Sequence, residues 1–249
     1  MGQAIAVALA EAGLDVAFCY RSYRKGADQT AAEVKQRGRR TLAVRSDARQ
    51  PAQVRSLFRK VRAALGPVAV LVNNVGEYTE GAIGSISFDD WKSSIDSNLH
   101  AAFLCSREAL ADMRVRRWGR IVNITESPAE TQAPAPGVAA YHVGKLALLA
   151  FTRALAWEEI KTGITVNAVG PGLTDNGHLG AKWHRLMSKQ SPLGRLVRPA
   201  EVARAVAFLV SPESAAITGA QLSVGGGWDM TGGSRPDASI EGVLRGRRR

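Results

Sequence analysis

The stretch VAVLVNN, residues 68–74, decides how this chain folds. It is a short apolar run rich in branched side chains, and two asparagines end it. A run of this length without polar alternation is typical of a β-strand buried on both faces of a parallel sheet. Further short apolar runs occur at 14–20, 41–47, 119–125, 163–172 and 220–227. The sequence therefore predicts a sheet of several buried strands.

Helical patterns separate these runs. The segment 51–66 starts with Pro51, which suits the first turn of a helix, and the segment 2–13 ends in Gly13, which suits a helix end. Further helices are expected at about 26–38, 87–115, 138–162 and 199–211. Strands that alternate with helices of this length form parallel βαβ units. We therefore predict an α/β fold with a doubly wound sheet covered on both faces.

Ligands of a doubly wound sheet bind at the carboxyl ends of its strands. The residues that follow the predicted strands are therefore the first candidates for a functional site. They are Arg21 and Ser22, Asp47, residues 73–76, residues 125–127 and residues 171–174.

The composition sets broad limits on the class of protein. The chain has 249 residues, 45% hydrophobic and 22% charged, as in a globular domain with a sizeable core. No apolar run is long enough to span a membrane, and we expect no signal peptide. The two cysteines, Cys19 and Cys105, form no metal-ligand spacing or disulfide framework, which favours a cytoplasmic location. The four histidines also lack metal-ligand spacing and are interpreted as surface or loop residues.

The formal net charge is +11, but the basic residues are spread along the chain. No basic module with interleaved aromatic residues is present, so a nucleic-acid partner is not expected. A basic surface suits a phosphorylated cofactor or an acidic substrate. We expect one domain over residues 1–230 and a mobile basic tail over 231–249.

The motif YHVGK, residues 141–145, carries the clearest chemistry. Residues four apart on a helix are neighbours, so Tyr141 and Lys145 project from one face. A tyrosine hydroxyl can act as an acid or base, but its ordinary pKa is too high for proton transfer at neutral pH. A nearby ammonium favours the phenolate and lowers that pKa. The pair is therefore a candidate acid/base unit.

Seven motifs in a fixed order give the chain a specific resemblance. They are NNVG (73–76), SNLHAAFLCSREAL (97–110), GRIVNIT (119–125), YHVGK (141–145), VNAVGPGLTDN (166–176), SPLGRLVRPAEVA (191–203) and ITGAQLSVGGGW (217–228). In this order and spacing the chain resembles the short-chain dehydrogenase/reductase family, and most closely its 3-oxoacyl-(acyl-carrier-protein) reductase-like members. The resemblance covers residues 2–230 and implies a single-domain Rossmann-type oxidoreductase.

The resemblance assigns four catalytic roles. Tyr141 is the acid/base, Lys145 lowers its pKa and holds the nicotinamide ribose, and Asn98 holds a water for proton relay. A serine after the strand at 119–125 polarises the carbonyl, and we assign Ser127. Counting forward from Arg120 places Glu126 at the serine position instead, and Thr125 is the reserve donor.

Cofactor choice depends on the residues after the strand at 14–20. An acidic residue there binds the ribose hydroxyls of NAD(H) and repels a 2′-phosphate. This chain has Arg21 and Ser22 at that point, and arginine suits phosphate. We therefore predict NADP(H) rather than NAD(H).

The resemblance also implies the remaining cofactor contacts. Asp47 would accept from the adenine amino group, and Asn73 and Gly76 would lie along the adenosine ribose. Pro171 and Gly172 would border the nicotinamide, beside Tyr141 and Lys145, and Thr174 would lie near its carboxamide or the phosphates.

The start of the family pattern is missing. Gly2 aligns with the last glycine of the phosphate-binding loop, and the first strand and two glycines are absent. Either Met1 is an internal methionine taken as the start, or the chain is a truncated paralogue. Because that strand is normally internal to the sheet, its absence would leave backbone exposed.

The substrate is expected to be a small carbonyl compound or alcohol, and an acyl thioester is one candidate. Trp183, Leu186 and Met187 lie in the segment 173–197, where the family has its substrate lid. A homodimer or homotetramer is expected, built partly from the helices at 87–115 and 138–162. The competing hypothesis is a non-catalytic Rossmann module with a binding or regulatory role.

Overall fold

Parallel strands form the centre of the structure, as the apolar runs predict. The structure, a computed structural model, describes residues 1–131, 135–177 and 180–231. The strands are β1 (Val16–Tyr20), β2 (Thr41–Arg45), β3 (Val70–Asn73), β4 (Gly119–Ile124), β5 (Ile164–Pro171) and β6 (Gln221–Val224). Each lies inside a predicted run, and all paired neighbours are parallel. Apart from Thr231, the predicted tail lies outside the described residues.

The helices alternate with the strands along the chain. They are α1 (Gly2–Glu11), α2 (Arg24–Gln36), α3 (Pro51–Leu65), α4 (Phe88–Ile95), α5 (Ala101–Arg116), α6 (Ala139–Glu159), α7 (Ala181–Gln190) and α8 (Pro199–Val210). Local chemistry sets several starts: Pro51 and Pro199 open α3 and α8, and the Ser87 hydroxyl accepts from the Asp90 amide at 3.0 Å to cap α4.

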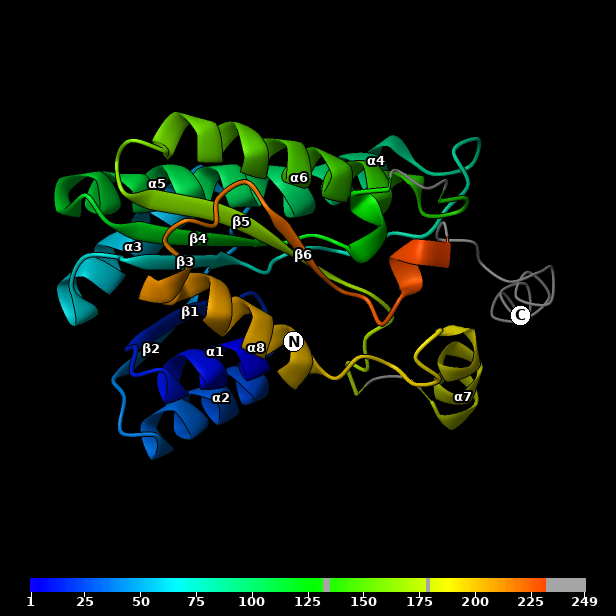
Figure 1. Cartoon of the computed structure of the whole chain (residues 1–249), viewed down its shortest axis with the longest axis horizontal. Coiled ribbons are helices and arrows are strands. Elements are labelled where there is room, and N and C mark those ends of the chain that lie inside the picture. Colours follow the sequence, from blue (N-terminus) through cyan, green and yellow to red (C-terminus); the bar gives the residue numbers. More distant parts are fainter. Residues whose placement is uncertain (132–134, 178–179, 232–249) are drawn as a thin grey trace.

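The two larger hydrophobic clusters of the described residues lie on opposite faces of the strands, beneath the helices that Figure 1 shows on either side. Helices α3, α5 and α6 enclose the core that contains Ile121, and helices α1 and α8 enclose the core that contains Val122. Successive residues of a strand point to opposite faces, so the adjacent pair on β4 serves both cores. This is the predicted doubly wound α/β arrangement, and that prediction is confirmed.

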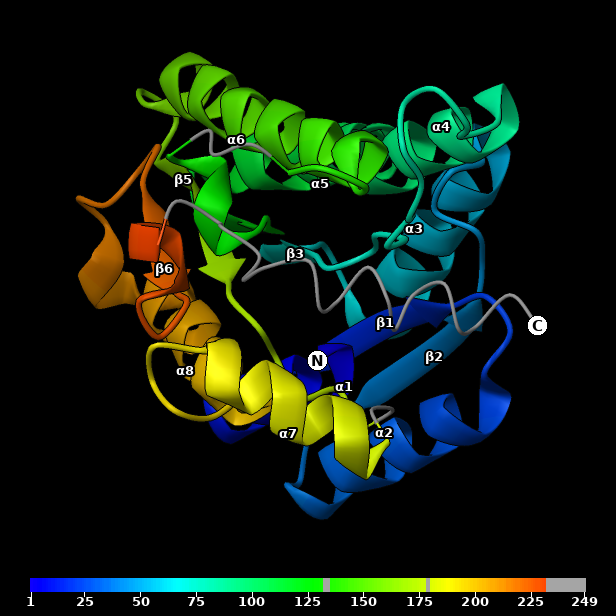
Figure 2. The ribbon, with the colours of Figure 1, turned by 90° about the vertical axis from the view of Figure 1, so that its right-hand side faces the viewer.

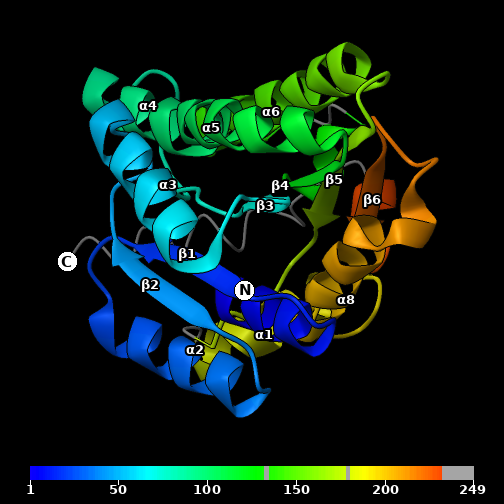
Figure 3. The ribbon, with the colours of Figure 1, turned by 90° about the vertical axis from the view of Figure 1, so that its left-hand side faces the viewer.

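The strands fall into two separate sheets. β1 pairs with β2, and the other sheet has the order β3-β4-β5-β6. Figure 3 shows the β1–β2 sheet lying apart from β3. Every residue of β4 and β5 is buried, whereas β1 buries only Val16 and β3 only Asn73. β1 and β3 thus each keep one unpaired edge, as expected when an internal strand is absent.

One predicted helix is interrupted. The sequence predicted a continuous helix over 87–115, but a π-helical turn, Asp96–His100, separates α4 from α5. Such single turns insert one extra residue and are frequent at functional sites. The turn carries Asn98, which is completely buried.

Helix α7 lies at the end of the molecule where β5 and β6 finish. Figure 2 looks onto this end and shows α7 and the turn Trp228–Thr231 in front of the strands. Among the described residues, no helix is both long and apolar enough to cross a membrane.

Candidate active site

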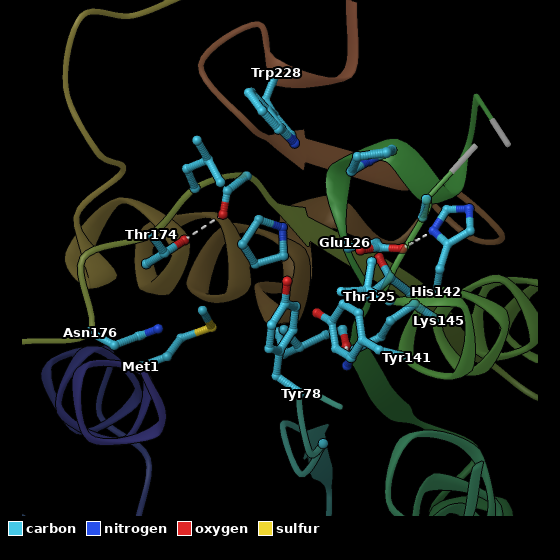
Figure 4. A pocket seen from close by; sticks show the side chains of 18 of the residues that line it. Met1, Tyr78, Thr125, Glu126, Tyr141, His142, Lys145, Thr174, Asn176 and Trp228 are labelled. Carbon is cyan, nitrogen blue, oxygen red and sulfur yellow. Dashed lines mark hydrogen bonds and ion pairs between the residues drawn. The ribbon is translucent and has the colours of Figure 1, made fainter. Parts of the chain in front are cut away.

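A cavity of about 680 Å³ lies at the carboxyl ends of β4 and β5 (Figure 4). Its walls come from the start of α1, the segments after β3, β4 and β5, the first turns of α6, and α7. The predicted site residues that line it are Gly2, Gly76, Tyr141, Lys145, Pro171, Gly172 and Thr174. Segments far apart in the sequence therefore meet where a doubly wound sheet binds its ligands.

Tyr141 and Lys145 share the cavity wall from the first turns of α6. The Lys145 ammonium is buried, lies 5.6 Å from the centre of the Tyr141 ring, and donates a 2.7 Å hydrogen bond to the backbone carbonyl of Ile124. Burial lowers the pKa of Lys145 to about 8, and the charge of Glu126 opposes that shift. The end of β4 thus fixes the lysine against the tyrosine.

The electrostatics of Tyr141 differ from the expectation. Burial raises the pKa of its phenol above the ordinary value, and Glu126 and Tyr78 raise it further. The Tyr78 ring meets the Tyr141 ring edge-on, with centroids 5.0 Å apart. The predicted lowering by Lys145 is therefore absent here, because desolvation and a carboxylate both disfavour the phenolate.

Asn98 reaches the same region from the π-helical turn. Its Nδ2 donates to the backbone carbonyls of Glu77 at 3.0 Å and Ser94 at 2.9 Å. Its Oδ1 is buried and has no hydrogen-bond partner within the described residues. A Cβ on Gly76 would lie 2.4 Å from that oxygen and 3.0 Å from Lys145 Nζ. Gly76, Asn98 and Lys145 therefore converge on one point that only glycine leaves open.

The structure does not bring Ser127 into this cavity. Ser127 begins a short 3-10 turn, is almost fully buried, and its hydroxyl has no partner among the described residues. Glu126 and Thr125 line the cavity instead. The Thr125 hydroxyl is engaged, donating to Gln221 Oε1 at 2.8 Å. Counting forward from Arg120 thus gives the residue that faces the site, and counting back from Tyr141 does not.

Asn73 lies in a buried polar network rather than in the cavity. Its Nδ2 donates to Asn123 Oδ1 at 2.8 Å and to Ser106 Oγ at 3.2 Å, and Asn123 donates to Thr152 at 2.8 Å. The network ties β3 to β4 and to the helices above them. The next residue, Asn74, lines the cavity.

Arg21, Ser22 and Asp47 lie outside the cavity, at the carboxyl ends of β1 and β2. Arg21 forms an ion pair with Glu77, and Asp47 forms one with Arg49 at 2.7 Å. The neighbouring guanidinium holds the pKa of Asp47 below its usual range. Arg21 and Asp47 therefore belong to a cluster of ion pairs with Glu77 and Arg49. Glu77 directly follows Gly76, which lines the cavity.

Sequence reasoning missed two groups at the site. His142 was interpreted as a surface or loop residue, but that interpretation is wrong: it is buried, lines the cavity and contacts the Glu126 carboxylate. Tyr78 packs on Tyr141 from the loop after β3. The place of His142 beside Tyr141 in YHVGK was the available signal.

Of the expected lid residues, Trp183 and Met187 line the cavity. No group of three potential metal ligands occurs within the described residues.

The wall suits a nicotinamide dinucleotide. A Cβ on Gly172 would lie 2.6 Å from the carbonyl oxygen of Gly225, so the backbone passes here without room for a side chain. The Thr174 hydroxyl, which donates to the Gly172 carbonyl at 2.9 Å, is a polar group on the wall, and the unpartnered Asn98 Oδ1 is buried next to Gly76, another residue of the wall. The residues present therefore fit the nicotinamide half of such a cofactor.

The fold and site define an oxidoreductase of the Rossmann type. Residues 1–229 match the family model described as enoyl-(acyl carrier protein) reductase, and the chain belongs to the short-chain dehydrogenase/reductase family.

Three similar proteins support this class. The 3-oxoacyl-(acyl-carrier-protein) reductase FabG of Staphylococcus aureus is 32% identical over 233 residues, covering 92% of this chain and 94% of that protein. A variant of actinorhodin polyketide ketoreductase with NADPH has a TM-score of 0.84 at 33% identity, covering 92% of both chains. A blue fluorescent protein from a metagenomic library, in complex with NADPH, has a TM-score of 0.83 at 37% identity, covering 91% and 92%.

Proposed function

We propose that the protein is an NADP(H)-dependent oxidoreductase that interconverts a ketone and a secondary alcohol. One observation carries the proposal. Tyr141 and Lys145 share a cavity wall with the strand-end residues of β4 and β5, and the buried lysine is held by the end of β4. A phenol and a buried ammonium in one cavity suit proton transfer to a developing alkoxide.

In this proposal the phenol of Tyr141 donates its proton to the carbonyl oxygen during reduction and regains it from the alcohol during oxidation. Bound NADPH supplies the hydride. Lys145 binds the nicotinamide ribose and provides the nearby positive charge. Asn98, with its open Oδ1, holds a water that returns a proton to Tyr141.

The donor that polarises the carbonyl is proposed to be Ser127, with Thr125 in reserve. Because Ser127 is buried beside the cavity, its hydroxyl reaches the substrate only if the turn Ser127–Ala129 shifts. The assignment fails if Ser127→Ala keeps kcat/KM within about threefold of the parent.

NADP(H) rather than NAD(H) is the proposed cofactor. Arg21 and Ser22 follow β1, where a 2′-phosphate would be bound by a guanidinium and a hydroxyl. Asp47, Asn73, Gly76 and Gly2 are proposed contacts toward the adenosine and pyrophosphate. Two of the similar structures named above are complexes with NADPH, which supports this choice.

The substrate is proposed to be a small carbonyl compound or its alcohol. An acyl thioester stays a candidate because the Staphylococcus aureus relative is named for a 3-oxoacyl substrate on acyl carrier protein. Following NADPH oxidation with β-ketoacyl thioesters, simple ketones and quinones tests the proposal. Turnover that Tyr141→Phe abolishes supports it, and NADPH binding without turnover of any substrate contradicts it.

A non-catalytic binding role is the second candidate. It is favoured by Ser127 lying outside the cavity and by a glutamate facing the reacting position. Such a module would bind the nucleotide in titration calorimetry and show no hydride transfer. The same experiment therefore separates the two functions.

Assembly and location remain predictions. Phe103 and Phe151 pack edge-on between α5 and α6, and Phe103 and Trp157 are exposed, which supports a dimer or tetramer through these helices. Light scattering tests this assembly, and a monomer in solution would contradict it.

The cytoplasmic location is supported by two free thiols, at Cys19 and Cys105.

A further inference from the structure

We propose that Glu126, fixed by His142, accepts a hydrogen bond from a hydroxyl or ammonium group on the substrate carbon next to the reacting carbonyl. The preferred substrates are then α-hydroxy or α-amino ketones rather than plain ketones or acyl thioesters. The inference rests on the proposed function, because it concerns the same cavity.

Glu126 lies at the reacting end of the cavity. It follows the last residues of β4 in an extended conformation, and its backbone carbonyl accepts from the Ala129 amide at 3.2 Å and from Gln221 Nε2 at 3.3 Å. Its charge acts on both Tyr141 and Lys145, whose pKa values it raises. The carboxylate is therefore close to both members of the acid/base pair.

His142 fixes the orientation of that carboxylate. Its Nδ1 contacts Glu126 Oε1, and both side chains are largely buried, with 9% and 15% exposed. Figure 4 shows the contact on the wall that also carries Tyr141. No contact to the second carboxylate oxygen is found in the described part of the chain, and Glu126 lines the cavity. One oxygen is thus held and the other is available to a ligand.

A carboxylate can only accept hydrogen bonds. It cannot polarise a carbonyl as a serine hydroxyl does, and it repels the negative charge that develops on the substrate oxygen. A substrate that places a donor beside the carbonyl turns this unfavourable contact into a charge-assisted hydrogen bond. The carboxylate therefore selects for a neighbouring donor.

The other charged groups of the wall also favour a substrate that carries a hydrogen-bond donor. Glu80 is a second carboxylate on the cavity wall, and within its described residues the wall contains no arginine. The Lys145 ammonium is engaged with Ile124. An anionic substrate would enter a cavity whose wall carries two carboxylates, and near the reacting carbon it would be repelled by Glu126, whereas a hydroxyl or an ammonium there would be stabilised.

Three ketones of equal size test the inference: 1-hydroxypropan-2-one, 1-aminopropan-2-one and butan-2-one. NADPH oxidation by the parent is expected to show kcat/KM at least about tenfold higher for one or both donor-bearing ketones than for butan-2-one. Which of the two donor-bearing ketones gives the higher kcat/KM shows whether Glu126 prefers a hydroxyl or an ammonium group. In Glu126→Gln, which removes the charge and keeps the size, this ratio is expected to fall to within about twofold of unity.

Glu130→Gln is the matched control, because Glu130 is an exposed carboxylate paired with Arg153 at 2.7 Å. It should leave the ratio unchanged. Equal rates with all three ketones, or a ratio that survives Glu126→Gln, would overturn the inference while leaving the reductase proposal intact.

Binding provides a readout that does not need turnover. Saturation-transfer NMR with each ketone, in the presence of NADP⁺, should show binding of the donor-bearing ketones to the parent and loss of that binding in Glu126→Gln. If turnover fails but this pattern holds, the proposed reaction falls and the ligand preference stands. Equal binding of all three ketones overturns the preference.

Discussion

The Lys145 ammonium lies 5.6 Å from the centre of the Tyr141 ring while it donates a 2.7 Å hydrogen bond to the backbone carbonyl of Ile124. The lysine therefore connects helix α6 to the end of β4. The hydrogen bond to the Ile124 carbonyl offsets part of the cost of burying the charged ammonium. This connection makes the acid/base pair sensitive to both elements.

Replacing Tyr141 with phenylalanine removes the proton donor and keeps the ring. We expect kcat to fall about 10²- to 10⁴-fold, the usual contribution of a positioned acid. Cofactor binding should stay within about twofold, because the ring still packs on Tyr78. Stopped-flow kinetics and NADPH fluorescence titration check this. A loss of cofactor binding equal to the loss of rate would indicate a structural role instead.

The buried Lys145 makes the stability depend on pH. Burial lowers the pKa of its ammonium from 10.5 to about 8, so between these values the unfolded chain holds the proton that the folded chain releases. The free energy of unfolding therefore falls as pH is lowered toward about 8, because protonation of Lys145 then stabilises the unfolded chain more than the folded chain, and it rises again as pH is raised. Relative to Lys145→Met, the parent should gain roughly 1–2 kcal/mol between about pH 8 and about pH 9.5.

Urea unfolding of both proteins at several pH values measures this difference. The range stays below about pH 10, because burial raises the pKa of Tyr141 and its contribution has the opposite sign above its unfolded value. A flat difference across the range would show that Lys145 titrates at an ordinary pKa.

Arg21 is expected to distinguish the two cofactors. In Arg21→Ala, the KM for NADPH should rise roughly ten- to a hundredfold, as for the loss of a charge-assisted hydrogen bond, while the KM for NADH stays nearly constant. Arg24→Ala is the control, because Arg24 is exposed and pairs only loosely with Asp28 at 3.6 Å. Equal effects on both cofactors, or a parent that prefers NADH, would contradict the assignment.

Gly172 is expected to tolerate no side chain. A Cβ there would lie 2.6 Å from the carbonyl oxygen of Gly225, which is backbone and cannot rotate away. Gly172→Ala should therefore lower the free energy of unfolding by roughly 1–3 kcal/mol, as overpacking does. Gly84→Ala is the control, since nothing lies within 4 Å of its Cβ position. Similar unfolding midpoints for the two variants would show that the segment after β5 can move aside.

The open edges of β1 and β3 predict uneven protection of backbone amides. Hydrogen exchange should be slowest in β4 and β5, which are buried along their whole length, and faster in β1 and β3. A version extended at its N-terminus by an apolar strand and a glycine-rich loop should slow exchange in β1 and β3 and raise the melting temperature. Unchanged exchange in the extended protein would show that no strand enters between them.

Much of the fold could be predicted from the sequence because its strands are short runs that are mostly apolar. β4 and β5 lie inside the predicted ranges, since burial on both faces makes most of their side chains apolar, and the asparagines Asn123 and Asn167 are hydrogen-bonded in the interior. The π-helical turn at Asp96–His100 could not be predicted, because its residues, DSNLH, are equally compatible with a further α-helical turn. The exposed backbone beside the missing first strand was expected only from the family resemblance.

The candidate site was predictable where spacing determines geometry. Tyr141 and Lys145 face one cavity because four residues make one helical turn. The contact between Glu126 and His142 depends instead on the path of the loop between β4 and α6, and no local spacing encodes that path. For the same reason, counting residues along that loop gave two answers for the residue facing the substrate.

The π-helical turn has a consequence for how this chain tolerates change. One surplus residue places α4 about 100° out of phase with α5, since each residue of an α-helix turns by that amount. Deleting a single residue between Asp96 and His100 would restore a continuous α-helix and rotate Asn98 away from Gly76 and Lys145. This one-residue deletion would thus keep the helix unstrained but take Asn98 out of the candidate site. We expect it to lower activity while leaving the domain folded.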